Sequence, residues 1–305
     1  MCLILKTGNN MTPMNGLGIG TSKFTFLQPI TNNYSIDLDG TDDFVNLGNS
    51  SEIKLRPTDT SEEGGTSVAA WFKGDWWDGT SSGYPGSTQS IVSCIAGGGW
   101  DLTVGTRINA QLNIVDPSDA SANKYLKIYG PFKKLDVGDQ SYRASGWTHV
   151  CMTFDGRTLK FYVNGREETG RHTEDIDSEA DDTPIRYATG NGDTDILIGA
   201  DPANLTGGVS GTATGSANFD GLIDQVAIWD KALDIAAVKE IFDAVDVDSD
   251  PLDLREDNGD YDYSDSLVGY WKMEEGTGTT VEDLSDNSNT GTLKNSPGWS
   301  TTTPS

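Results

Sequence analysis

The chain has 305 residues, of which 47 are acidic and 21 are Lys or Arg, so its formal net charge is −26 at pH 7. This balance excludes nucleic acid as an expected partner, because nucleic-acid binding draws on clustered Lys and Arg. The 36 glycines and the many Thr, Ser, Asn and Asp residues indicate strands and turns, and the length suits one large all-β domain with appendages, although it also fits two domains.

The cysteines and the opening residues bear on the compartment. Cys2, Cys94 and Cys151 are too few for a disulfide framework, so we expect buried free thiols, with a single Cys94–Cys151 bridge as the alternative. The first apolar run ends at Lys6, which is too short for a signal peptide, and no later segment is apolar enough to span a membrane. We therefore expect synthesis in a cytoplasm, no signal peptide and no membrane insertion.

Residues 1–32 are predicted to form an N-terminal arm that lies on another surface, or else a disordered leader, because they are Gly-, Thr- and Asn-rich with a weak apolar pattern. The domain proper is predicted to begin at residue 33. Alternating apolar residues then predict two strands around a tight turn at Gly40. These residues are Tyr34, Ile36, Leu38, Val45 and Leu47.

A series of short strands follows. Residues 67–72 are apolar on both faces, which predicts an inner strand. Further apolar runs divided by Gly, Asn, Asp and Pro predict strands at 91–95, 100–104, 112–115, 125–129, 147–154, 159–163 and 196–198. The turn Asp155-Gly156 makes residues 147–163 the clearest hairpin in the chain.

The stretch from residue 218 to 244 joins two periodicities. Residues 222–229 are apolar except Asp224 and Gln225, which predicts a strand covered on both faces. Asp234 then has the character of a helix N-cap, and Leu233 and Val238 occupy the hydrophobic staple positions. We therefore expect the closing strand to lead directly into one short helix.

Three motifs point to one family. The runs SIDLDGTDDFVNLG at 35–48 and WTHV at 147–150, with FYVNG at 161–165, resemble the laminin G-like domains of the concanavalin A-like lectin/glucanase jelly rolls, and the run from 218 to 244 is similar to their closing motif. The resemblance implies an all-β fold over residues 33–245. The expected architecture is a two-sheet antiparallel jelly-roll sandwich with one short helix after the closing strand.

Two segments follow this domain. Residues 246–265 carry nine carboxylates and, of the basic residues, Arg255 alone, so we expect an acidic, solvated linker. Residues 266–305 resemble the segment that normally opens a laminin G-like domain. They are predicted either to fold back beside the strand near Tyr34 and complete the sandwich, which is the favoured arrangement, or to pair with a neighbouring chain as a truncated repeat.

Catalytic chemistry has little support in the sequence. Glycosidases of the wider class use two carboxylates on one strand, and no such run occurs here. His149 lies inside a strand motif, where a hydrogen-bonded structural role is the better interpretation, and a serine or cysteine triad and a zinc site both lack support. We expect no enzymatic activity.

Calcium is a better-founded ligand. Asp39, Asp42 and Asp43 crowd one tight turn, and Asp224 is an inward-pointing acid that must be paired or ligated. The family resemblance implies a structural cation near these two motifs. The alternative is that the turn is capped by its own Asx hydrogen bonds and that Asp224 accepts backbone N–H groups.

Carbohydrate is the second candidate ligand. Sugar C–H faces stack on flat aromatic rings, and the glycine-rich loop after residue 72 carries Trp76, Trp77 and Tyr84, with Trp100 behind them. The alternative is that these rings plug the end of the sandwich.

Together these features predict a non-enzymatic structural or recognition protein of the virion type, such as a bacteriophage decoration, fibre or tail component, with glycan binding as a further possibility. Its partners would be other protein subunits of an assembly and a surface glycan, and it would act on a virion or a cell exterior. The alternative function is a calcium-supported carbohydrate-binding module of a non-viral surface protein, and a glycoside hydrolase is the least favoured.

Overall fold

The computed structural model describes most of the predicted domain and the whole C-terminal segment except its last residue. The described residues are 31–54, 65–74, 88–95, 98–105, 107–116, 119–132, 146–169, 185–186, 195–206, 212–213, 217–246 and 251–304. The predicted arm lies outside them apart from its last two residues.

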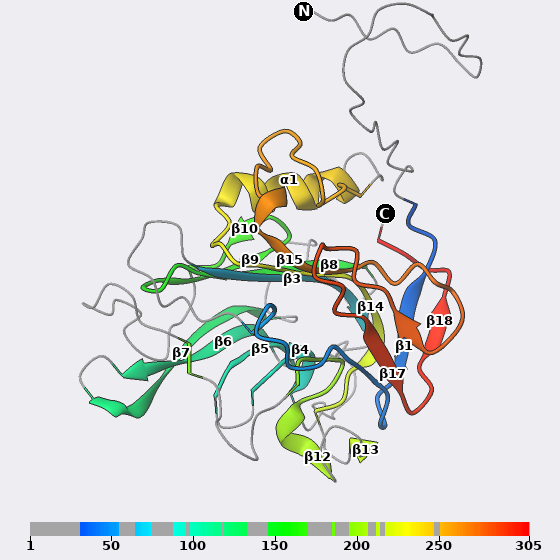
Figure 1. Cartoon of the computed structure of the whole chain (residues 1–305), viewed down its shortest axis with the longest axis horizontal. Helices are drawn as coiled ribbons and strands as arrows, with labels where there is room; N and C mark the ends of the chain where they lie inside the picture. The colour runs from blue at the N-terminus through cyan, green and yellow to red at the C-terminus, as the bar shows by residue number, and fades with distance from the viewer. Residues whose placement is uncertain are drawn as a thin grey trace, which may run out of the picture.

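Two antiparallel sheets stack face to face (Figure 1). The first, sheet A, has the order β10-β9-β8-β3-β14-β1-β18, and β15 also pairs with β14. Its strands are β1 (Ser35–Asp39), β3 (Thr66–Gly74), β8 (Thr148–Phe154), β9 (Leu159–Val163), β10 (Arg166–Glu167), β14 (Asp220–Trp229), β15 (Leu267–Trp271) and β18 (Gly298–Ser300).

The second, sheet B, has the order β16-β17-β2-β11-β4-β5-β6-β7. Its strands are β2 (Phe44–Asn46), β4 (Gln89–Ser93), β5 (Trp100–Val104), β6 (Arg107–Asp116), β7 (Asp119–Phe132), β11 (Leu197–Ile198), β16 (Thr280–Val281) and β17 (Gly291–Lys294). A small ribbon of β12 (Leu205–Thr206) and β13 (Thr212–Ala213) follows a short 3-10 helix, Pro202–Asn204. The predicted two-sheet antiparallel jelly-roll sandwich is therefore confirmed.

The main core lies between the sheets. On β5, for example, Trp100, Leu102 and Val104 alternate into it and have no exposed surface. The predicted inner strand is confirmed, because β3 lies between β8 and β14 and is buried on both faces. Cys94 and Cys151 are buried free thiols as expected, and Cys2 lies outside the described residues.

Helix α1 (Ile235–Asp246) covers the outer face of sheet A (Figure 1). The predicted cap is present, since the Asp234 carboxylate accepts the backbone N–H of Ala237 at 2.9 Å. Val238 is fully buried with Trp229 of β14 in a second apolar cluster on this face. The helix forms because its apolar side fits the outward residues of the central strands.

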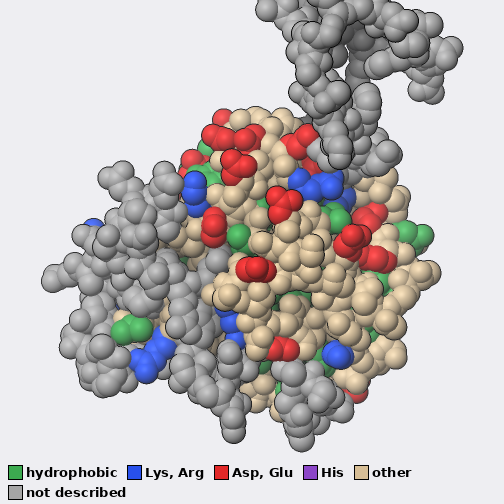
Figure 2. Space-filling view, in the orientation of Figure 1, with side chains coloured by type: hydrophobic (Ala, Val, Ile, Leu, Met, Phe, Trp, Pro, Cys, Tyr) green, Lys and Arg blue, Asp and Glu red, His purple; other side chains and the backbone are tan. Residues whose placement is uncertain are grey.

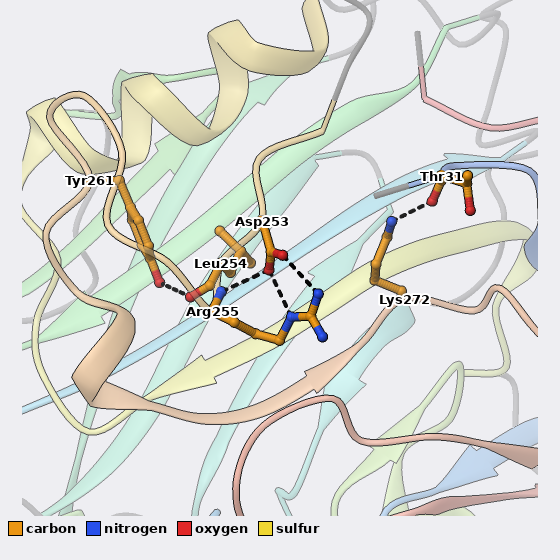
Figure 3. Close-up of polar contacts among 6 residues, drawn as sticks. All are labelled: Thr31, Asp253, Leu254, Arg255, Tyr261 and Lys272. Carbon is orange, nitrogen blue, oxygen red and sulfur yellow. Dashed lines mark hydrogen bonds and ion pairs between the residues drawn. The ribbon is translucent and has the colours of Figure 1, made fainter. Parts of the chain in front are cut away.

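Residues 251–263, which we expected to be part of a solvated linker, instead pack on this outer face beside α1. Leu252, Leu254 and Tyr261 are buried there, and the acids between them point outward or pair. The Tyr261 hydroxyl accepts a bond from Trp229 Nε1 at 2.9 Å. It donates to the carbonyl of Leu254 at 2.8 Å, as Figure 3 shows. Burial of these apolar residues outweighs the acidic composition of the segment.

The C-terminal segment completes the same sandwich in cis. A second 3-10 helix, Ser264–Ser266, leads into β15, which pairs with β14; further on, β17 pairs with β2 and β18 with β1. Figure 1 shows the red C-terminal strand beside the blue β1. Of the two arrangements that the sequence left open, this is the fold-back. No helix among the described residues is long and apolar enough to cross a membrane.

Candidate functional site

Of the four aromatic residues predicted to bind carbohydrate, Trp100 lies within the described residues. Trp76, Trp77 and Tyr84 lie outside the described residues. Trp100 is fully buried in β5, where its indole packs in the core between the sheets. Its ring therefore offers no face to a sugar, and its role in the described structure is packing.

Three of the four predicted cation ligands come together. One ligand oxygen from each of Asp39, Asp42 and Asp43 lies within 4.8 Å of the others, in the turn between β1 and β2. Asp39 Oδ1 also accepts the backbone N–H of Thr41 at 2.8 Å, so the expected Asx hydrogen bond and the cluster coexist. The turn is held from outside by Asn295 Nδ2, which donates to the Asp42 carbonyl at 2.8 Å.

The electrostatics of this turn fit a cation. Burial, together with the nearby charges of Asp39, Asp42 and Asp37, raises the pKa of the Asp43 carboxyl to about 6 against an opposing hydrogen bond. A hard divalent ion such as calcium takes carboxylate and carbonyl oxygens, and it would relieve this repulsion. The residues present therefore fit the predicted ion.

Asp224 lies apart from this turn. The register pairs Asp39 with Asp220, so Asp224 is four residues further along β14, or about 13 Å away at strand rise. It lies at a bulge in β14, it is fully buried, and its Oδ1 accepts the backbone N–H of Gln225 at 2.8 Å. Burial, reinforced by the charge of Glu274, raises its pKa well above the ordinary value. Asp224 is thus not a fourth member of the Asp39 cluster, and it does accept a backbone N–H.

His149 has a structural environment. It is fully buried between Trp71, 5.1 Å away between ring centroids, and Phe242 of α1 at 6.4 Å. Burial lowers its pKa to about 3, so the imidazole stays neutral at physiological pH. The structural role is packing against these rings, and the expected hydrogen bond is not seen at Nδ1, which has no partner among the described residues.

Lys272 and Glu274, in the C-terminal segment, bind residues 31–33, which lead into β1. Glu274 accepts the backbone N–H of Asn33 at 2.8 Å and the hydroxyl of Thr31 at 3.2 Å. The Lys272 ammonium donates to the Thr31 carbonyl (Figure 3). We call Lys272 and Glu274 the clamp. A pocket of about 230 Å³ beside the clamp is lined by Lys272, Glu274, Glu275, Glu282 and Leu284.

Sheet B carries a second candidate site, which the sequence did not reveal. The strand register places Asp101 opposite Gln111 and Gln111 opposite Lys127, and it places Asn113 opposite Tyr125. Neighbours in sequence such as Leu102, Leu112 and Leu126 point into the core, so these side chains share the outer face. We call this set the polar face: Ser90, Ser93, Asp101, Thr103, Asn109, Gln111, Asn113, Tyr125, Lys127 and Tyr129.

The inner part of the polar face is buried but incompletely bonded. Asp101, Asn109 and Asn113 are 4%, 6% and 0% exposed. One carboxyl oxygen of Asp101, Oδ1 of Asn109 and both amide atoms of Asn113 have no hydrogen-bond partner within the described part of the chain. Buried polar atoms are almost always hydrogen-bonded in proteins, so this face has unused capacity for polar ligand groups or water.

The outer part of the polar face is open and aromatic. The Tyr125 side chain is 49% exposed, whereas Gln111, Lys127 and Tyr129 are half-buried. Lys127 Nζ lies 5.0 Å from the centroid of the Tyr129 ring, and the guanidinium carbon of Arg107 lies 5.8 Å from it. Amides, a hydroxyl-bearing ring and a cation thus line one surface.

The acid of the polar face is Asp101, whose pKa is influenced by burial and by the charge of Asp201. Burial, together with the charge of Asp201, raises the pKa of Asp101 well above its ordinary value, while the hydroxyls of Ser90 and Ser93 oppose the shift. The oxygens of Asp201 are occupied in capping, because they accept from Ala203 N at 2.8 Å and Asn204 Nδ2 at 3.1 Å. A two-carboxylate mechanism needs a second free acid. Among the described side chains of this face, Asp101 alone is a carboxylic acid.

Comparison with known proteins places the chain in a family. A family model described as the concanavalin A-like lectin/glucanases superfamily, of the laminin G type, matches residues 47–239, more than half of the chain. No curated protein sequence matches the chain.

Solved structures with a similar fold include a putative carbohydrate binding protein from Bacteroides ovatus, 14% identical, with a TM-score of 0.49; the match covers 90% of this chain and 61% of that one. A heptameric SAP-like pentraxin from Limulus polyphemus is 15% identical over 69% of this chain and 82% of that one, with a TM-score of 0.38. The botulinum neurotoxin serotype G binding domain is 16% identical over 64% of this chain and 39% of that one, with a TM-score of 0.41. Likeness at this level does not imply a shared ligand.

Proposed function

Because the chain belongs to the concanavalin A-like lectin/glucanases superfamily, we propose that it is a non-enzymatic recognition protein that binds carbohydrate on the polar face. The observation that carries the proposal is a set of buried polar atoms on Asp101, Asn109 and Asn113, which have no hydrogen-bond partner among the described residues and lie beside the exposed ring of Tyr125. Sugars offer both hydroxyl groups and apolar C–H faces. A surface with amides beneath an aromatic ring is complementary to both.

The chemistry of binding follows from the side chains. A sugar ring stacked on Tyr125 would present hydroxyls to the Asn113 amide, which stands opposite it on β6 and has a donor and an acceptor available. Each such bond would contribute about 0.5–1.5 kcal/mol net. Because the groups lie on regular strands, they are held in position before the ligand arrives.

We also propose that Asp39, Asp42 and Asp43 hold a calcium ion that supports the turn between β1 and β2. The close approach of their oxygens and the raised pKa of Asp43 support this. The ion would act structurally, since bound calcium stabilises the folded state over the unfolded chain.

A second candidate function is the structural role in an assembly. The observation that favours it is the clamp, because Lys272 and Glu274 bond to Thr31 and Asn33, where the predicted arm meets the domain. A virion location stays a prediction from the sequence. Mass measurement of the purified protein in solution tests the assembly role: a particle or defined oligomer supports it, and a monomer opposes it.

Glycan-array binding tests the principal proposal. We expect the protein to bind a discrete set of glycans, and Tyr125→Ala or Gln111→Ala to weaken that binding about 10-fold or more. Ile235→Ala is the matched control, since Ile235 is 50% exposed on α1, far from sheet B. If Trp76→Ala with Trp77→Ala abolishes binding and the polar-face variants do not, the site lies in the predicted loop instead. An array without any bound glycan would overturn the proposal.

A further inference from the structure

We propose that the polar face selects sugars that carry a carboxylate, with Lys127 as the residue that binds the carboxylate and Tyr125 as the residue that stacks on the ring. This inference rests on the proposed carbohydrate binding and names the ligand class. It follows from the position of one ammonium group among amides, hydroxyls and the buried acid Asp101.

Lys127 lies on the proposed ligand surface, and it forms no ion pair with another described residue. Its Nζ lies over the Tyr129 ring at 5.0 Å, and the pairing register sets it between Tyr125 and Tyr129 on the same face of β7. A cation over an aromatic ring is stabilised without losing its charge, and its N–H groups remain able to donate to an anion. Lys127 is therefore a fixed positive charge at the edge of the site.

The groups that face Lys127 leave this charge in place. From β6 they are the neutral amides of Gln111 and Asn109, together with the Arg107 cation on the far side of Tyr129. From β5 the facing group is Asp101, a buried acid whose pKa is raised well above its usual value, mainly by burial. Burial also lowers the pKa of Lys127, and Asp101 partly opposes that shift.

The spacing suits a single sugar residue. Tyr125 and Lys127 are two positions apart on one face of a strand, which separates them by about 7 Å. A pyranose ring stacked on Tyr125 can direct a carboxylate on its ring carbon toward Lys127 Nζ over that length. At the same time Asn113, opposite Tyr125, can bind the ring hydroxyls.

The overall negative charge of the protein opposes the approach of an acidic sugar. At −26 the molecule repels anions at long range, and Figure 2 shows acidic side chains over much of the described surface on the face drawn there. That field is screened within about 10 Å at 0.1 M salt. Preference for an acidic sugar would therefore arise from contact with Lys127 and not from general attraction.

Titration calorimetry with paired probes tests the inference. The panel holds oligosaccharides of galacturonate, glucuronate, mannuronate and a sialic acid, each with its carboxyl-reduced partner, which has the same ring hydroxyls and no charge. We expect at least one acidic member to bind about 10-fold more tightly than its reduced partner. Lys127→Met should remove the difference in affinity between the acid and its reduced partner. Lys127→Gln serves the same purpose if the Met variant does not fold. The control, Lys160→Met on β9, should preserve the difference.

The outcomes separate this inference from the proposed function. If the reduced partners bind as tightly as the acids, or if Lys127→Met keeps the preference, carboxylate selection is overturned. If neutral sugars bind and Gln111→Ala lowers their affinity, the proposed carbohydrate binding is still supported. If no member of the panel and no glycan on the array binds, both ideas are overturned together.

Discussion

Glu274 accepts the backbone N–H of Asn33 at 2.8 Å and thereby joins two residues 241 positions apart in the chain. The same carboxylate also accepts the Asn33 side chain at 3.1 Å and the backbone N–H of Tyr34 at 3.3 Å. One acid from the C-terminal segment thus satisfies several donors at the point where the N-terminal end of the described chain enters sheet A.

Replacing this carboxylate should loosen the junction. We expect Glu274→Gln to lower the free energy of unfolding by about 1–2 kcal/mol, because hydrogen bonds to a charged acceptor are worth more than those to an amide and several donors share this one. Urea unfolding at pH 7 measures the change. The matched control is Glu282→Gln, an exposed acid that lines the same pocket and that should change stability by less than about 0.5 kcal/mol. Equal effects of the two substitutions would contradict the role of Glu274.

Calcium should stabilise the protein through the Asp39 turn. At 100-fold excess over its Kd, an ion that binds only the folded state adds about 2.7 kcal/mol, which raises Tm by several degrees. Asp42→Asn should remove most of this gain. The control is Asp155→Asn, which alters an acid in another turn, where Asp155 Oδ1 accepts the backbone N–H of Arg157 at 2.8 Å. A Tm that is the same in calcium and in a chelator would show that this turn binds no ion.

Stability without calcium should depend on pH through Asp43. Its pKa is raised to about 6 in the folded protein, against an ordinary value near 4 in the unfolded chain, so the folded state binds the proton more tightly. The stability that the protonated Asp43 carboxyl contributes to the folded state is then fully present below about pH 4, and it is lost as the pH rises through 6.

In a chelating buffer at pH 7, Asp43→Asn should therefore be more stable than the parent by on the order of 1–3 kcal/mol, and the advantage should shrink toward pH 4. Denaturant titrations at several pH values measure this. A variant less stable than the parent at pH 7 would mean that the Asp43 charge is favoured in the folded state.

The contact between Trp229 and Tyr261 should carry part of the stability of the outer layer. Tyr261→Phe keeps the ring and removes the hydroxyl, so it leaves Trp229 Nε1 without its partner in the buried layer beneath residues 251–263. We expect a loss of about 1–3 kcal/mol, measured by chemical denaturation. Faster hydrogen exchange confined to residues 251–263 and α1 would accompany it. An unchanged midpoint would indicate that water replaces the hydroxyl.

The sequence predicted those features that depend on local periodicity. Alternation was sufficient for β5 and the 147–163 hairpin, and the Asp234 cap with its staple was sufficient for α1, because each signal lies within one turn or one strand. The grouping of Asp39, Asp42 and Asp43 followed from their closeness in the chain.

Features that depend on distant pairing were not predictable. The expectation that Asp224 lies near the Asp39 turn depended on the register between β1 and β14, which pairs residues more than 180 positions apart. The many acids of residues 251–263 led to the prediction of a solvated segment. Its three buried apolar residues pack on the sheet, and that contact could not be read from the local sequence. The polar face was missed because the strand predicted at 112–115 was too short to display the odd-numbered polar positions 107, 109, 111 and 113 of β6.

The pairing of Ser35 with Ser300 has a mechanical consequence. Antiparallel strands β1 and β18 place the beginning of one and the end of the other at the same corner of sheet A, where Asn32 and Pro304 are also bonded at 3.3 Å. Tension applied between the two ends would peel β18 away one hydrogen bond at a time, which needs little force.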